Sequence, residues 1–278
     1  MRTSGAPETP AYILGHSEEE LGRLGRQAEL VDPMTRRFFE AAGIGPGMRV
    51  LDVGSGAGHV AILAAQLVGP SGQVIGVDRA PAALMTARAR TEALNLRNVS
   101  FLEGELTEVR FGQPFDAVLG RYILMFQPDP VATLRALVRH LRPDGIVVFH
   151  EIDWDGARSN PRVAPYDDSC RWILETIEKN GVHGRMGAKL PSTFVAAGLP
   201  APSLALESLI GGGEDEERIR FVTEVVGTLH ESIVAAGVAT AAEIDIATLP
   251  QRIAAQAIAE RAVLVCRSEI GAWSRVPG

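Results

Sequence analysis

Apolar segments alternate with helix-like segments between residues 48 and 152, and this alternation predicts the fold of that part of the chain. The interior apolar runs are continuous, as expected for strands of a sheet whose two faces are both covered. Strand followed by helix, repeated along the chain, is typical of an α/β fold with a largely parallel sheet and helices on both faces. The five predicted strands lie at 49–53, 73–77, 99–102, 115–119 and 146–152.

The flanking regions add a helical segment in front and a helical cap behind. Residues 18–42 show helical spacing of apolar positions, with a break expected at Asp32-Pro33. Two further strands at 203–210 and 262–270 bring the predicted sheet to seven strands. About fifty mainly helical residues separate these two strands, and a second helical stretch follows strand five. We therefore predict a helical segment at 1–45 and one domain at 46–278, with cap parts at about 155–190 and 211–260.

A glycine-rich turn follows the first strand. Gly54, Gly56 and Gly58 stand two apart, a helix-like run comes next, and the second strand ends in Asp78. Glycine lets a ligand approach the backbone closely, because no Cβ stands in the way. A carboxylate at the tip of the next strand can accept two hydrogen bonds from a ribose diol. These features predict a nucleoside-containing cofactor across the carboxyl ends of two parallel strands.

The spacing of the glycines argues against a dinucleotide. A dinucleotide fingerprint reads G-x-G-x-x-G and places a pyrophosphate at the following helix N-terminus. Here the pattern is G-x-G-x-G, and Asp52 inside the strand is a poor neighbour for a diphosphate but a good one for a cationic or amino-bearing ligand. The Tyr-x-x-x-Lys pair of short-chain dehydrogenases is also missing from the sequence. A nicotinamide-dependent oxidoreductase is thus disfavoured.

The run D-V-G-S-G-A-G at 52–58 resembles motif I of the class I S-adenosylmethionine-dependent methyltransferases. Residues 98–105 look like the third strand and adenine-contacting turn of that family, and 115–122 like its fourth strand. The R-P-D-G turn at 142–145 is similar to the turn before strand five. The resembling region covers about residues 48–154 and implies a Rossmann-like sheet.

The resemblance implies S-adenosylmethionine as cofactor and S-adenosylhomocysteine as product. In the family, the glycine loop holds the methionine portion and the acid after strand two holds the ribose. Most relatives carry Asp where this chain has Glu105, so the adenine contact is expected to shift by one methylene. Helices preceding the domain close over the cofactor in the family, although simple packing of 1–45 is equally compatible with the pattern. The matching cofactor residues are Asp52, Gly54, Ser55, Gly56, Gly58, Asp78, Arg79, Gly104, Glu105, Leu106 and Arg121.

The chemistry implied is direct in-line methyl transfer. The methyl group of a sulfonium is already electrophilic, so alignment of donor and acceptor can supply roughly 7–11 kcal/mol of the barrier. A hydroxyl or phenol acceptor would also benefit from a base at the carboxyl ends of strands four and five. His150 is the first candidate because imidazole titrates near working pH, with a packed strand-end histidine as the alternative. Glu151 and Tyr122 are the other catalytic candidates.

Three residues are candidates for the acceptor site. Tyr12 near the start could lie over the active site, as aromatic residues there do in some relatives. Trp154 borders the first cap insertion, where burial against the cap is the alternative, and His183 lies between two glycines in the cap. A cap of this size favours a small organic acceptor over a protein surface or a long nucleic acid. O- or C-methylation is expected and N-methylation is compatible; the alternative is a protein that binds the cofactor but catalyses a non-methylating cyclisation or elimination.

Charge, hydropathy and cysteine content disfavour several classes of partner for this chain: nucleic acid, membrane and metal. A net charge of −7 and a pI near 5.5 disfavour a dedicated nucleic-acid binder. No apolar run is long enough to span a bilayer, and the first residues lack the apolar core of a signal peptide, so a cytoplasmic monomer or homodimer is expected. The two cysteines, Cys170 and Cys266, are far apart without metal-ligand spacing, so no metal is expected.

Overall fold

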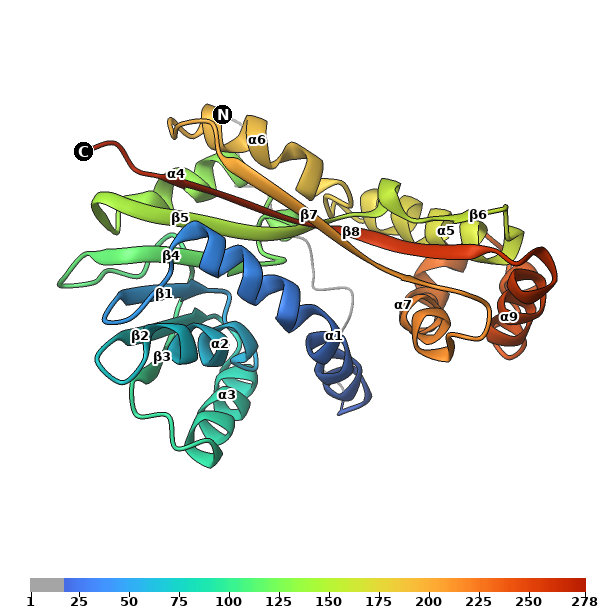
Figure 1. Ribbon diagram of the computed structural model, residues 1–278, viewed down its shortest axis with the longest axis horizontal. Coiled ribbons are helices and arrows are strands. Elements are labelled where there is room, and N and C mark those ends of the chain that lie inside the picture. The colour runs from blue at the N-terminus through green and yellow to red at the C-terminus, as the bar shows by residue number, and fades with distance from the viewer. Residues whose placement is uncertain (1–17) are drawn as a thin grey trace, which may run out of the picture.

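One eight-stranded sheet forms the centre of the computed structural model, which describes residues 18–278 (Figure 1). The strand order is β3-β2-β1-β4-β5-β8-β6, and β7 pairs with the other edge of β8. β1 to β5 pair in parallel, whereas β8 runs antiparallel to β5, β6 and β7. The strands are β1 Arg49–Val53, β2 Gln73–Asp78, β3 Val99–Glu103, β4 Phe115–Arg121, β5 Leu141–Asp153, β6 Arg158–Asn160, β7 Ser203–Gly211 and β8 Val263–Arg275.

Helices cover both faces of this sheet and also form a separate layer at one end. α1, α2 and α3 share a buried cluster with one face, and α4 and α6 pack on the opposite face. α5, α7 and α9 contact one another beyond the carboxyl end of β5 (Figure 1). The helices are α1 Glu18–Ala42, α2 His59–Val68, α3 Pro81–Ala93, α4 Pro130–Val138, α5 Ala164–Lys179, α6 Met186–Ala196, α7 Glu216–Ala235, α8 Ala241–Ile244 and α9 Leu249–Glu260, with 3₁₀ turns η1 Leu124–Phe126 and η2 Trp154–Gly156.

The continuous apolar strands are buried on both sides, as the sequence predicts. In β5, Ile146 and Val148 belong to the cluster under α1 and α2, whereas Val147 and Phe149 belong to the cluster under α4 and α6. Successive side chains of a strand point to opposite faces, so an uninterrupted apolar run fills both layers. The predicted α/β class with a Rossmann-like sheet is confirmed.

Two details of the sheet differ from the sequence prediction. β5 begins at Leu141, and the predicted turn at 142–145 bulges out between the register pairs Phe115↔Leu141 and Ala117↔Ile146. The short β6 makes eight strands instead of seven. Its residues, Arg158-Ser159-Asn160, are polar and carry no strand pattern, and they are extended because they pair with β8.

The expected break at Asp32-Pro33 does not occur. α1 continues through Pro33 to Ala42. Proline removes one hydrogen-bond donor from a helix interior and is unfavourable there. Around it, Val31, Met34 and Phe38 are buried against the rest of the molecule. Burial of this apolar face compensates for the lost hydrogen bond. Helix propensities, which describe single residues, do not include this stabilisation by tertiary packing.

The cap region follows its predicted helical character. Gly237, with φ +62, follows the end of α7. Pro250 stands in the first turn of α9, where its missing N–H has no intrahelical acceptor to lose. The insertion between β7 and β8 forms α7, α8 and α9, and of these α7 and α9 pack against α5.

Phe38 anchors α1 to the sheet. Its ring lies edge-on to His150 with centroids 4.9 Å apart, and it occupies the space beside Gly271, where a Cβ would collide with it. We expect Phe38→Ala to lower the free energy of unfolding by about 3–5 kcal/mol, because a fully buried ring is replaced by a cavity. Urea denaturation measures this loss. Glu40→Ala on the exposed side of the same helix should change stability by less than about 0.5 kcal/mol, and equal losses in both variants would contradict the assignment.

Candidate functional site

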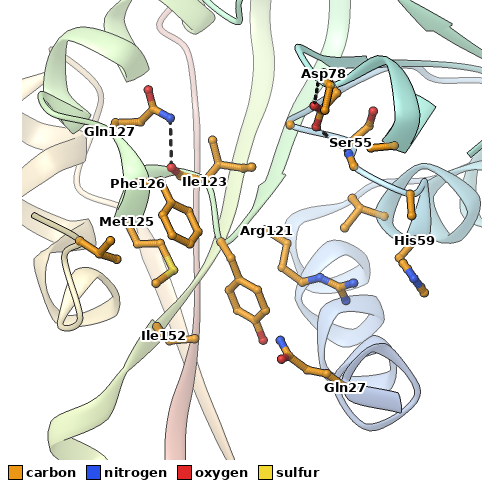
Figure 2. Close-up of a pocket in the computed structure, with 18 of the residues that line it drawn as sticks. Gln27, Ser55, His59, Asp78, Arg121, Ile123, Met125, Phe126, Gln127 and Ile152 are labelled. Carbon is orange, nitrogen blue, oxygen red and sulfur yellow. Dashed lines mark hydrogen bonds between the residues drawn. The ribbon is translucent and has the colours of Figure 1, made fainter. Parts of the chain in front are cut away.

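A cavity of about 380 Å³ opens at the carboxyl ends of the parallel strands, between α1 and the cap. Figure 2 shows Ser55, Asp78 and His59 on one side of it and Met125, Phe126 and Ile152 on the other, with Arg121 between them. The first side is built by the loops after β1, β2 and β3, and the second by η1, β5 and the cap helices. The cavity thus has a polar half and an apolar half.

The glycine loop after β1 is held close to its neighbours. Gly54, Gly56 and Gly58 all have positive φ, at +65, +49 and +82. A Cβ on Gly54 would collide with Ile123, and one on Gly58 would press on Ala87. At Gly56 nothing lies within 4 Å of the position of a Cβ, so the loop backbone faces open space there. A left-handed backbone and close packing together require glycine at these positions.

Asp78 at the end of β2 lies beside this loop and is hydrogen-bonded to it. Its Oδ2 accepts a hydrogen bond from the Gly56 N–H and its Oδ1 accepts one from Ala80, both at 2.8 Å. Ser55 Oγ is buried beside it and has no hydrogen-bond partner within the described part of the chain. Both residues line the cavity, where the Asp78 carboxylate is available to a ligand, whereas the Ser55 hydroxyl is itself enclosed by the protein.

Asp52 and Gly58, both predicted to contact the cofactor, do not line the cavity. Asp52 is 1% exposed beneath the loop, and its Oδ2 finds no partner among residues 18–278. Burial raises the pKa of Asp52 to about 8, although the charge of Arg121 opposes the rise. This geometry favours support of the loop from below over the predicted direct contact.

Five further predicted cofactor residues do line the cavity: Arg79, Gly104, Glu105, Leu106 and Arg121. The Arg121 side chain is 8% exposed, and its Nη1 donates to Asp32 Oδ1 at 2.6 Å and to Thr35 Oγ1 at 2.9 Å. Since Asp32 and Thr35 belong to α1, these bonds fix the N-terminal helix over the cavity edge. α1 also contributes lining residues itself, namely Gln27, Ala28 and Val31.

His59 completes the polar half. It begins α2, lines the cavity and lies 3.2 Å from Arg90 through its Nδ1. Burial, with the charges of Arg90 and Arg121, lowers the pKa of His59 to about 4. The ring is therefore neutral near pH 7.

His150, the first candidate for a base, lies outside the cavity lining. It is fully buried, with Nδ1 3.0 Å from Thr35 Oγ1 and Nε2 2.9 Å from a carboxylate oxygen of Glu269. Burial lowers the pKa of His150 more than Glu269 raises it. A ring with both nitrogens engaged and no access to the cavity cannot take a proton from an acceptor, so this geometry does not support the predicted role.

Glu151 is likewise turned away from the cavity. Its Oε1 accepts from the backbone N–H groups of Ile123 at 2.9 Å and Leu124 at 2.7 Å, and its Oε2 faces Met125 N at 3.4 Å. Burial raises the pKa of Glu151 to about 8 despite these three bonds. The carboxyl group shapes η1, whose side chains line the cavity, and this position does not support direct catalysis.

Tyr122 does reach the cavity. It follows β4 with φ +57, unusual for a residue with a side chain, and its backbone N–H donates to His150 O. Its hydroxyl donates to Glu269 Oε2 at 2.8 Å and accepts from Arg267 Nη2 at 3.2 Å. Burial and the charge of Glu269 raise the pKa of Tyr122, so the phenol stays protonated.

Of the predicted acceptor residues, only Trp154 is placed at the cavity wall. His183 does not line the cavity. Its Nε2 lies 3.1 Å from Gln127 O and its backbone N–H donates to Met125 O, so it supports η1 from behind. Tyr12 lies outside the described residues.

The sequence did not predict that Arg267 and most of the apolar side chains lining the cavity belong to the site. Arg267 is 5% exposed, lines the cavity and donates through Nε to Glu269 Oε1 at 3.0 Å. One signal was present: an arginine and a glutamate two residues apart inside an apolar strand share one face and can pair there. The apolar wall, drawn from segments far apart in the chain, consists of Met125, Phe126, Ile152, Ile173, Ile177, Val182, Val225 and Leu229.

The described residues contain neither a metal-binding cluster nor a membrane-spanning helix. No group of three or more His, Cys, Asp or Glu side chains within 18–278 is placed to hold a metal ion. No helix in the same range combines the length and apolarity needed to cross a membrane.

Comparison with known proteins identifies the family. The model of a methyltransferase domain matches residues 44–190, just over half of the chain. The chain belongs to the class I methyltransferases. Aklanonic acid methyltransferase DauC of Streptomyces sp. (strain C5) is 33% identical over 150 residues, which are 54% of this methyltransferase and 67% of DauC.

Other relatives match shorter segments. Nocamycin O-methyltransferase of Saccharothrix syringae is 35% identical over 118 residues, 42% of each chain. Arsenite methyltransferase of Halobacterium salinarum is 36% identical over 112 residues, 40% of this methyltransferase and 29% of the relative. These two alignments thus span less than half of the relatives' own length.

Solved structures share the fold at low sequence identity. A crystal structure assigned as a methyltransferase from Bacillus halodurans C-125 has a TM-score of 0.57 at 18% identity, covering 87% of this methyltransferase and 98% of that chain. The cyclase SpnF has a TM-score of 0.54 at 20% identity, covering 88% and 80%. At such identities the likeness concerns the fold.

The class I fold implies S-adenosylmethionine as methyl donor, and the polar half of the cavity fits that molecule. Asp78 offers a carboxylate for a ribose diol, the usual partner at this strand end. The open space over Gly56 lets a ligand lie against the loop backbone. The residues present therefore suit the cofactor.

The buried carboxyl of Asp52 makes stability depend on pH. Its folded pKa of about 8 lies above the unfolded value near 3.9. The folded state then binds the extra proton between these values, so this group's contribution to stability falls as pH rises from about 4 to about 8. Asp52→Asn removes the titration, and its stability relative to the natural chain should increase by at least about 1 kcal/mol between pH 5 and pH 8.

Urea denaturation of both proteins across this pH range measures the difference. Asp144→Asn, at an exposed position in the bulge of β5, is the matched control and should show no such trend. A difference that stays constant with pH for Asp52→Asn would mean that Asp52 is ionised in the folded protein.

Proposed function

We propose that this methyltransferase transfers a methyl group from S-adenosylmethionine to a small, largely apolar organic acceptor, on oxygen or carbon. The observation that carries the proposal is the two-part cavity, in which a glycine loop with Asp78 adjoins an apolar chamber without an intervening wall. Pockets of a few hundred Å³ with apolar walls and few polar groups are typical small-molecule sites. Nitrogen as the acceptor atom is compatible with the same chamber.

The residues of the polar half would hold the cofactor. Asp78 would bind the ribose, the loop at 54–57 the methionine portion, and Gly104 to Leu106 the adenine. When bound, the cofactor supplies an electrophilic methyl group. The chain contributes binding and alignment, and its apolar walls reduce the contact of the acceptor with water.

The named relatives support a natural-product acceptor. DauC is named for aklanonic acid and another relative is named as nocamycin O-methyltransferase. The likeness to the cyclase SpnF rests on the fold alone and adds no site residue. A cofactor-binding protein without methyl transfer is the alternative, and labelled methyl transfer separates the two.

Asp78→Ala tests the cofactor site. Loss of the carboxylate removes two charge-assisted hydrogen bonds to the ribose, so the affinity for S-adenosylhomocysteine should fall by about tenfold to a hundredfold. Isothermal titration calorimetry measures it. Glu103→Ala is a matched control, because Glu103 pairs in register with Asp78 at the end of β3 but does not line the cavity. An unchanged affinity in Asp78→Ala would remove this residue from the proposed site.

Val225→Trp tests the acceptor chamber. Val225 is buried on α7 and lines the apolar wall, so a large ring there should fill the space for an acceptor. With methyl-labelled S-adenosylmethionine and a panel of aromatic alcohols and acids, we expect transfer to fall at least about tenfold while S-adenosylhomocysteine still binds. Val234→Trp, at an exposed position of the same helix, should transfer normally.

Failure of the natural chain to transfer label to any member of the panel, while it binds the cofactor, would favour the non-methylating alternative. Unaltered transfer by Val225→Trp would place the acceptor elsewhere.

A further inference from the structure

We propose that the acceptor is an organic carboxylic acid, bound as its carboxylate by Arg267 at the wall of the apolar chamber. This inference rests on the proposed function and adds the chemical class of the acceptor. Four features of the described residues support it: the placement of Arg267, its free donors, its pairing with Glu269 and the lack of a base beside it.

Arg267 is a guanidinium enclosed by aromatic rings. Its Cζ lies 5.2 Å from the ring centroid of Tyr122, 5.3 Å from that of Trp154 and 5.0 Å from that of Phe221. Tyr122 and Trp154 line the cavity together with Arg267. Cation–π contacts with these three rings favour one orientation of the planar group.

Some of the N–H donors of the Arg267 guanidinium are not used in hydrogen bonds within the described residues. Of its five N–H groups, the hydrogen bonds described use Nε toward Glu269 and Nη2 toward the Tyr122 hydroxyl. The remaining donors belong to a side chain that is 5% exposed and faces the cavity. A carboxylate matches the fork of an arginine better than a neutral group does.

Glu269 partly neutralises the positive charge of Arg267 but occupies only one of its N–H donors. Burial opposes the charged state, yet the adjacent carboxylate raises the pKa of Arg267, so the guanidinium remains protonated. The pair can thus orient an acid through hydrogen bonds while holding it less tightly than an isolated buried cation would. Moderate binding is an advantage because the acid loses its charge during methyl transfer, and very tight binding of the charged form would raise the barrier to the reaction.

Within residues 27–278, whose side chains the structure describes, none at the chamber is placed to remove a proton. Among the described cavity-lining residues, His59, Asp78 and Glu105 lie on the cofactor side, and Tyr122 stays protonated. His150 and Glu151 are sealed behind the wall. An alcohol or phenol would need a base there, whereas a carboxylic acid is already ionised near pH 7.

The reaction then needs no proton transfer. A lone pair of the carboxylate oxygen forms the new O–CH₃ bond, and the electrons of the S–CH₃ bond remain on sulfur. The carboxylate and the sulfonium each lose their charge, giving a neutral ester and a thioether. A reaction that removes two opposite charges is favoured beside apolar side chains, which stabilise charges less than water does.

Binding of a charged and a neutral probe to the natural chain tests the inference. Calorimetric titrations use naphthoic acid and its carboxamide, with the protein saturated with S-adenosylhomocysteine at pH 7. The two probes have nearly the same shape, so a difference reports recognition of the charge. We expect the acid to bind at least about tenfold more tightly, the effect of one good charge-assisted hydrogen-bond pair.

The double variant Arg267→Met/Glu269→Gln removes both charges of the pair, so that neither is left buried alone. It should bind the acid and the amide within about twofold of each other. Arg267→Lys keeps the charge and should retain part of the preference. Arg220→Met, at an exposed position on α7, is the control for loss of a positive charge and should keep the full preference.

The outcomes separate this inference from the proposed function. Equal binding of acid and amide by the natural chain, or an unchanged preference in the double variant that still binds S-adenosylhomocysteine, would overturn the carboxylate assignment alone. Absence of S-adenosylhomocysteine binding by the natural chain would overturn the proposed function and this inference with it.

Discussion

The buried carboxylate of Glu269 is the interaction on which the arrangement of the site depends. It lies within β8, pairs with Arg267 and accepts hydrogen bonds from the Tyr122 hydroxyl and the His150 ring. Burial alone would raise its pKa, but the charge of Arg267 and the two hydrogen-bonding neighbours hold the pKa of Glu269 below its ordinary value. One carboxylate therefore connects β5, β8 and the residue that follows β4.

The same cluster joins the two halves of the cavity. From Glu269, contacts run through His150 to Thr35 on α1, and from Thr35 through Arg121 to Asp32. α1 also supplies lining residues at the cofactor side. Buried polar networks of this kind hold a single geometry when all members are satisfied, because any broken member leaves an unpaired group in low dielectric. The position of α1 and the wall of the acceptor chamber are thus fixed by one set of bonds.

A second buried carboxylate, Glu151, performs a similar structural task at η1. Its bonds to three successive backbone N–H groups hold the turn from which Met125 and Phe126 line the chamber. His183 supports this turn from the cap side. Glu151 and His183 therefore position this turn, and the apolar side chains of Met125 and Phe126 form the surface that it presents to the chamber. This division is consistent with a reaction in which alignment of two bound molecules matters most.

The sequence alone determined the sheet, the class of cofactor and most of the polar half of the cavity. These follow from local features: continuous apolar strands, glycines required by left-handed backbone, and an acid at a strand end. Gly54, Ser55, Gly56 and Asp78 all line the cavity, and their contact with the cofactor stays a prediction. Tertiary structure decided the rest. Whether His150, Glu151 or Arg267 faces the cavity depends on which neighbour each meets across the sheet, and β5 meets β8 only through pairing of segments more than a hundred residues apart. The continuity of α1 through Pro33 has the same cause, since burial against β5 and β8 outweighs a local preference. Periodicity reports which face of an element is buried, but only packing between distant elements decides which buried group touches a ligand.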